Sequence, residues 1–115
     1  MATQPGRPIV AGYEWRLRVQ VTATPARFPV GVALRAQLRT AMGAANALAT
    51  LSTADGSIAR IDNNTIELVI AGSVSASWRS PVIVCDVIRI DLAEPQHGGF
   101  RLRIPVVQPV TRVAP

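Results

Sequence analysis

Apolar and polar residues alternate along several short segments of this chain, and the alternation predicts β-strands. The clearest segment runs from Tyr13 to Ala23, where Trp15 begins the apolar series and Arg16 begins the polar series. A period of two places successive side chains on opposite faces of a strand. One face of this strand is therefore predicted to be buried, and the other to present arginine to solvent.

The same pattern predicts further strands, separated by residues that favour turns. The predicted strands cover 32–39, 48–53, 65–70, 82–92 and 100–107, with another strand edge at 58–61 and turns at 54–57, 62–64 and 94–99. Residues 82–92 are apolar on both faces apart from three charged residues, which predicts a central strand covered on both sides. Pro105 predicts that the last strand lies at an edge or contains a bulge.

Strands with short turns and no long helix predict an all-β fold, an antiparallel β-sandwich of about six to eight strands. A chain of 115 residues is long enough for one domain with its own core, predicted to span 13–107. Residues 1–12 and 108–115 show no periodicity and are predicted to be an extended N-terminal arm and an extended C-terminal tail.

Three residues of the predicted arm, Pro8, Ile9 and Val10, are candidate partner-binding residues. An extended segment can add to the sheet edge of a neighbouring subunit through main-chain hydrogen bonds. The two extended ends therefore predict a protein that is held by its neighbours.

Arginine dominates the charge of the chain, with 12 basic residues, all of them arginine, against 7 acidic residues. The planar guanidinium suits carboxylates and phosphates, and it pairs with them through two parallel hydrogen bonds. The polar faces of three predicted strands supply candidate partner-binding residues, namely Arg16, Arg18, Arg35, Arg39, Arg101 and Arg103. If these strands share a sheet, the arginines form one positive surface; otherwise they are separate solvated side chains.

The residues that usually carry chemistry are sparse. A zinc site needs three or four suitable ligands, whereas the chain has one histidine and one cysteine. His97 lies among proline and glycine and is predicted to be an exposed turn residue, and Cys85 is predicted to be a small buried hydrophobic residue. Asp86 is predicted to be half-buried and paired with an arginine or with backbone donors. The sequence thus predicts no catalytic, cofactor-binding or metal-binding residue and no enzymatic activity.

Two other classes of binding protein depend on exposed aromatic side chains. Proteins that bind single-stranded nucleic acid usually place aromatic residues among the basic ones, and no aromatic lies among these arginines. Direct nucleic-acid binding is therefore disfavoured. A carbohydrate-binding β-sandwich for host attachment remains the alternative, although the chain has only two Trp and one Tyr. No apolar run is long enough to span a membrane.

Four segments of the chain, 51–58, 64–70, 84–91 and 106–112, resemble a group of small tailed-phage and prophage structural proteins. These are similar to the immunoglobulin-like N-terminal domain of phage baseplate upper proteins, in which a strand with a central aspartate precedes a hairpin and a closing strand. Asp86, the 94–99 turn and the 100–107 strand match that order.

The resemblance implies an immunoglobulin-like virion protein without a cofactor, whose partners are other capsid or tail subunits. It implies many copies on a symmetric particle, or a homo-oligomer, that stabilise the particle through protein contacts. Baseplate upper proteins continue into a long fibre-bearing extension, whereas this sequence stops at Pro115. The expectation is therefore capsid decoration or a tail or baseplate accessory module.

Overall fold

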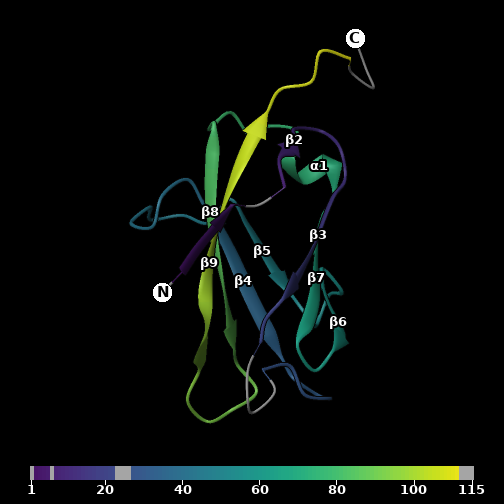
Figure 1. Ribbon diagram of the computed structural model, residues 1–115. Coiled ribbons are helices and arrows are strands. Elements are labelled where there is room, and N and C mark those ends of the chain that lie inside the picture. The colour runs from purple at the N-terminus through teal and green to yellow at the C-terminus, as the bar shows by residue number, and fades with distance from the viewer. Residues whose placement is uncertain (1, 6, 23–26, 112–115) are drawn as a thin grey trace.

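The structure is a computed structural model that describes residues 2–5, 7–22 and 27–111, and its regular secondary structure is almost entirely β-strand (Figure 1). The strands are β1 (Ala2–Pro5), β2 (Ile9–Val10), β3 (Trp15–Gln20), β4 (Leu34–Arg39), β5 (Ala49–Ser52), β6 (Ile58–Asp62), β7 (Thr65–Ile70), β8 (Val82–Arg89) and β9 (Gln96–Val107). One helical turn, α1 (Gly72–Ser75), connects β7 to β8.

These strands form two sheets that enclose one core. The larger sheet has the order β1-β9-β8-β4-β5, with β2 also paired to β9, and the smaller sheet has the order β3-β7-β6. In Figure 1, β8, β9 and β4 lie on one side of the molecule and β3, β7 and β6 on the other. The predicted all-β sandwich is confirmed.

The core follows directly from the alternating pattern, because the apolar series of each strand points between the sheets. Leu68 of β7 and Ile83 of β8 are fully buried, and Leu102 of β9 is 2% exposed. The strands predicted at 13–23 and 32–39 are present as β3 and β4, each with its arginines outside the core. Residue 23 lies outside the described residues.

β8 has a central position in its sheet, as predicted, but the expectation that both of its faces are covered is wrong. Ile83, Cys85 and Val87 are buried against the smaller sheet, whereas Val84 and Ile88 are only half-buried. Among the described residues, no further layer lies above the outer face of β8, so its apolar residues are sheltered by neighbouring side chains on the same face.

The predicted turn at 94–99 is displaced, because β9 already begins at Gln96. After an irregularity in register between Asp86 and Ile88, β8 and β9 continue to pair as far as Arg89 and Gln96. Gly99 has a φ of +84°, a left-handed conformation that glycine adopts easily and that often accompanies a β-bulge. The two glycines of this segment therefore accompany a bulge within the hairpin, and the connection occupies residues 90–95.

The N-terminal segment belongs to the sandwich and is not a separate arm. Both β1 and β2 run parallel to β9, and Ile9 is fully buried in the core. Residues 1 and 6 of the predicted arm lie outside the described residues. The reason sequence periodicity missed these strands is their length, since β2 is too short to display an alternating pattern.

Pro105 occupies a place that the prediction of an edge or bulge did not anticipate. β9 pairs on both sides, with β8 on one and with β1 and β2 on the other. The Val106 N–H donates to the Pro81 carbonyl at 2.9 Å, on the β8 side. Since backbone groups of successive residues alternate in direction, the proline nitrogen faces the opposite side, in the interval between β1 and β2.

The predicted C-terminal tail is described as far as residue 111 and remains in contact with the domain, while residues 112–115 lie outside the described part. The Gln108 side chain donates to the Trp78 carbonyl at 3.0 Å, and the Tyr13 hydroxyl donates to the Thr111 carbonyl at 2.7 Å. Trp78 itself is 5% exposed.

Candidate interaction surface

Four of the predicted arginines lie together on the outer face of the larger sheet. Arg35 and Arg39 come from β4, and Arg101 and Arg103 come from β9. Cross-strand partners share a face of the sheet, and β8 lies between the two pairs. We call this surface the arginine face; its residues are Arg35, Gln37, Arg39, Val84, Asp86, Ile88, Arg101 and Arg103.

The register of the three strands arranges the arginine face in cross-strand rows. One row places Val84 between Arg39 and Arg103. The next row places Asp86 between Gln37 and Arg101. The result is one column with arginines on β4 and another on β9, and between them lies a central column from β8 that is mainly apolar.

The positive charge of the arginine face is largely uncompensated. Within the described residues, none of its four guanidinium groups has a carboxylate within 4.0 Å. Arg39 donates to neutral groups, to the Ala44 carbonyl at 2.9 Å and to Gln37 Oε1 at 2.7 Å. Arg101 contacts Met42 Sδ, and its buried Nε has no hydrogen-bond partner in the described part of the chain. These arginines are therefore available to an external anion.

Asp86 is the acidic residue of the arginine face, and its partner is a histidine. His97 Nε2 lies 2.9 Å from Asp86 Oδ2, while the Gly99 N–H donates to His97 Nδ1 at 2.9 Å. This arrangement corrects two expectations, because His97 belongs to β9 and Asp86 does not pair with an arginine. The bulge next to Asp86 is the reason, since it brings His97 alongside the carboxylate.

The hydrogen bonds of His97 also define what this pair can do chemically. With Nδ1 accepting from the backbone, the neutral ring carries its proton on Nε2 and donates it to Asp86. Both ring nitrogens are thus occupied by Asp86 and Gly99, so neither nitrogen is free to take a proton from a nucleophile. The pair fixes the end of the β8–β9 hairpin against the sheet.

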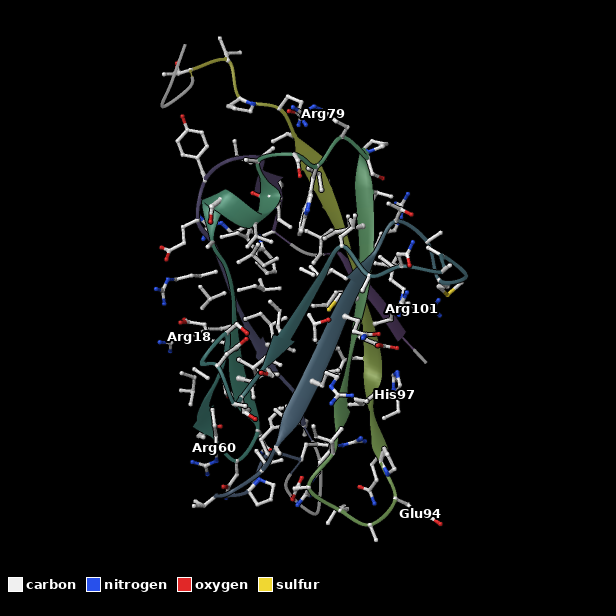
Figure 2. The ribbon with its side chains drawn as sticks, turned by 180° about the vertical axis from the view of Figure 1, so that it is seen from behind. Arg18, Arg60, Arg79, Glu94, His97 and Arg101 are labelled. Atoms are coloured by element: carbon white, nitrogen blue, oxygen red, sulfur yellow. The ribbon has the colours of Figure 1, made fainter. Side chains whose placement is uncertain are left out.

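Arg16 and Arg18 do not belong to the arginine face, because the condition for one common surface, a shared sheet, holds for β4 and β9 but not for β3. They lie on β3, on the outer face of the smaller sheet, and Figure 2 shows Arg18 on the opposite side of the sandwich from Arg101. Glu67 Oε1 lies 3.1 Å from Arg16 Nη1, and Glu67 Oε2 lies 3.2 Å from Arg18 Nε. A second carboxylate, that of Glu14, lies 3.2 Å from Arg16 Nη2.

This pairing affects the ionisation of Glu67. The hydrogen bond from Arg18, followed by the one from Arg16, holds the pKa of the Glu67 carboxyl below its ordinary value. The carboxylate therefore stays ionised and compensates charge on the smaller sheet over a wide pH range.

The three candidate residues of the predicted arm have different surroundings. Ile9 is buried in the core, so its side chain is not available to a partner. Pro8 is exposed and Val10 is half-buried, and both line a groove of about 690 Å³ together with Tyr13 and Val110.

Aromatic side chains contribute little to the surface. Trp15, Trp78, Phe28 and Phe100 are each at most 5% exposed. Tyr13 is half-buried at the end of the sandwich, away from the arginine face. None of these residues provides a platform on which a base or a sugar ring can stack on the arginine face.

Cys85 points from β8 into the core, as predicted for a small hydrophobic residue. Burial raises the pKa of its thiol to about 12, so the thiolate that reactive cysteines require does not form near neutral pH. In the ranges 2–5, 7–22 and 27–111, no group of three or more His, Cys, Asp or Glu could hold a metal ion. No helix of the described chain is long and apolar enough to cross a membrane.

Periodicity identified the arginines but missed the other members of the arginine face. The sequence predicts Val84 and Ile88 to be covered on a central strand, and Gln37 carries no functional signal of its own. Their common position follows from the pairing of β4, β8 and β9, which is a long-range property. Comparison of the chain with protein-family models and with curated proteins gives no match.

Proposed function

We propose that this chain is a non-enzymatic structural protein of a tailed-phage particle, an immunoglobulin-like module that attaches to an acidic surface of a capsid or tail subunit through the arginine face. The observation that carries the proposal is the group of four arginines on one side of the sandwich without a carboxylate partner in the described chain. Guanidinium groups recognise carboxylates through paired, charge-assisted hydrogen bonds.

The strand order supports the immunoglobulin-like part of the proposal. In immunoglobulin domains the last strands, F and G, share a sheet with C, while B, E and D form the opposite sheet. Here β9, β8 and β4 occupy the positions of G, F and C, with β5 as an added C′ strand, and β3, β7 and β6 occupy those of B, E and D. This order agrees with the family resemblance of the sequence.

A protein partner is favoured over a carbohydrate. Sugar-binding sites commonly stack sugar rings on exposed aromatics, as bases are stacked in single-strand binding proteins. Four of the five aromatic residues of this chain are instead buried in the core. The exposed groups of the arginine face are charged and suit carboxylates.

The test is incorporation into particles. Gradient-purified particles from the source lysate are analysed by quantitative mass spectrometry for the wild-type chain and for a variant with Arg35, Arg39, Arg101 and Arg103 changed to Gln. The matched control changes Arg16 and Arg18 to Gln. We expect the wild type and the control in the particles, and a loss of the four-arginine variant.

The copy number relative to the major capsid protein distinguishes the two positions within the proposal. Abundance near that of the capsid protein indicates head decoration, whereas a few to a few dozen copies indicate a tail or baseplate ring. Absence of the wild-type chain from the particles refutes the virion role. Undiminished incorporation of a folded four-arginine variant refutes attachment through the arginine face.

A further inference from the structure

We infer that the arginine face receives a single amphipathic α-helix of a partner protein, with an apolar stripe flanked by carboxylates on both sides. This inference rests on the proposed function, since it specifies the partner segment that the same surface binds. The observations that carry it are the spacing of the two arginine columns, the apolar character of the column between them and a hollow beside it.

The spacing of the arginine columns matches the width of a helix. β4 and β9 are separated by β8, so their columns lie two strand spacings apart, about 10 Å. An α-helix with its side chains is roughly 10–12 Å wide. Arg35 and Arg39 are four residues apart along β4, or about 13 Å, which corresponds to roughly nine residues of helix. One helix seated along β8 therefore reaches both columns.

The centre of the arginine face suits apolar side chains. Val84 and Ile88 of β8 are half-buried, and no layer of the described part of the chain covers them, while Met42 is 70% exposed next to Arg101. A hollow of about 250 Å³ lies between Arg39, Met42, Val84 and Arg101, with Gln37 and Asp86 also at its lining. This hollow has room for an aliphatic side chain such as leucine, whose transfer from water would contribute to affinity.

The same centre disfavours a nucleic acid. A phosphate backbone laid along β8 would meet the carboxylate of Asp86, which is 47% exposed in the middle of the arginine face. Bases would find no aromatic side chain on which to stack, since the tryptophans and phenylalanines are buried. A helix instead separates its apolar stripe from its flanking charges by its period of 3.6 residues.

The test measures the binding of three probes to the full chain by fluorescence anisotropy. The first probe is a helical peptide of about 14 residues with leucine on one stripe and glutamate on both flanks. The second has the same composition in scrambled order, so that its charge is equal but its apolar stripe is lost. The third is an oligothymidine of about 12 nucleotides.

We expect the amphipathic peptide to bind roughly tenfold more tightly than the scrambled one, since burial of one apolar side chain supplies that factor. Arg35→Gln with Arg103→Gln should weaken binding of this peptide, and Val84→Ser should remove its advantage over the scrambled peptide. Arg16→Gln with Arg18→Gln should leave binding unchanged. Circular dichroism verifies that each variant is folded.

Three results would overturn the inference: equal binding of the scrambled peptide, binding of the oligothymidine at least as tight as that of the amphipathic peptide, and an equal loss in the Arg16 and Arg18 variant. If the peptide preference fails while the four-arginine variant is still lost from particles, the helical partner is refuted and the proposed function stands. If the four-arginine variant is incorporated normally, attachment through the arginine face is refuted, whatever the result with the peptides.

Discussion

The two outer faces of the sandwich carry arginine at the same kind of alternating position, but they differ in what lies opposite those arginines. On the smaller sheet, Arg18 of β3 is directly opposite Glu67 of β7, and both Arg16 and Arg18 reach this carboxylate. On the larger sheet the acidic residue is Asp86, and its carboxylate is turned to His97. The first face is largely neutralised, whereas the second remains positive.

The comparison shows that the number of arginines does not determine the charge that a surface presents to a partner. Two carboxylates, Glu67 in cross-strand position and Glu14 just before β3, offset the charges of Arg16 and Arg18 on the smaller sheet. A bulge of one strand does the opposite on the larger sheet, because it provides Asp86 with a histidine partner and leaves Arg101 without a carboxylate partner in the described chain. Pairing geometry, rather than composition, therefore distinguishes an interaction surface from a solvated one.

The largest effect is expected from a change in the common core, because the two outer faces exist only while the two sheets pack together. Leu68 is fully buried on the inner side of β7. Leu68→Ala should lower the free energy of unfolding by about 2–5 kcal/mol, because it removes buried methyl groups and leaves a cavity. Urea denaturation followed by circular dichroism measures the loss. A loss below about 0.5 kcal/mol, the range of ordinary surface substitutions, would contradict the packing of the two sheets.

Glu67→Gln should convert the neutralised face into a second positive face. Arg16 and Arg18 would lose their shared carboxylate, so affinity for polyglutamate should rise by about twofold to fivefold, the range of exposed ion pairs. Fluorescence anisotropy at low ionic strength measures this affinity. Glu94→Gln, which makes the same change of net charge in the 90–95 connection, is the control. An equal rise in both variants would show that net charge alone matters.

The smallest effect concerns Arg89, which within the described ranges has a carboxylate partner, Asp91, that the other arginines of the larger sheet lack. Hydrogen bonds from Arg89, and a weaker one from the Ala33 N–H, lower the pKa of Asp91 from 3.8 to about 2. Since this pKa is lower in the folded state, the ionised Asp91 stabilises the fold above pH 3.8, and the contribution disappears as the pH falls through 2.

Asp91→Asn should therefore flatten the decline of the urea midpoint between pH 3.8 and pH 2 relative to the wild type. The measurement is a series of urea titrations across this pH range for both proteins. Parallel declines in the two proteins would contradict a role of Asp91 in acid stability.

The alternating pattern determined the faces of individual strands well, for a physical reason. A period of two is a local property, so the buried and exposed residues of β3 and β4 were predictable without knowing their partners. Which sheet each strand joins depends on contacts far apart in the sequence. The grouping of Arg35 with Arg101, and the separation of Arg16 from both, therefore became apparent only in the folded chain.

The folded chain differs from the sequence-based prediction at two further places, because residues there can serve more than one kind of structure. Gly98 and Gly99 favour turns, yet in this hairpin they lie within β9 beside a bulge, so that His97 became a strand residue next to Asp86. Ile9 and Val10 lie among prolines and glycines and form a strand of only two residues. Such a segment has no detectable period, although its burial anchors the N-terminal part of the sheet.

The parallel pairing of β1 and β2 with β9 has a mechanical consequence. Tension applied at the beginning of β1 and at the end of β9 pulls these parallel strands in opposite directions along their length. The hydrogen bonds between them are then loaded in shear, so they share the force instead of opening one after another. A module joined to its neighbours at these two points would resist stretching through the strands that close its larger sheet.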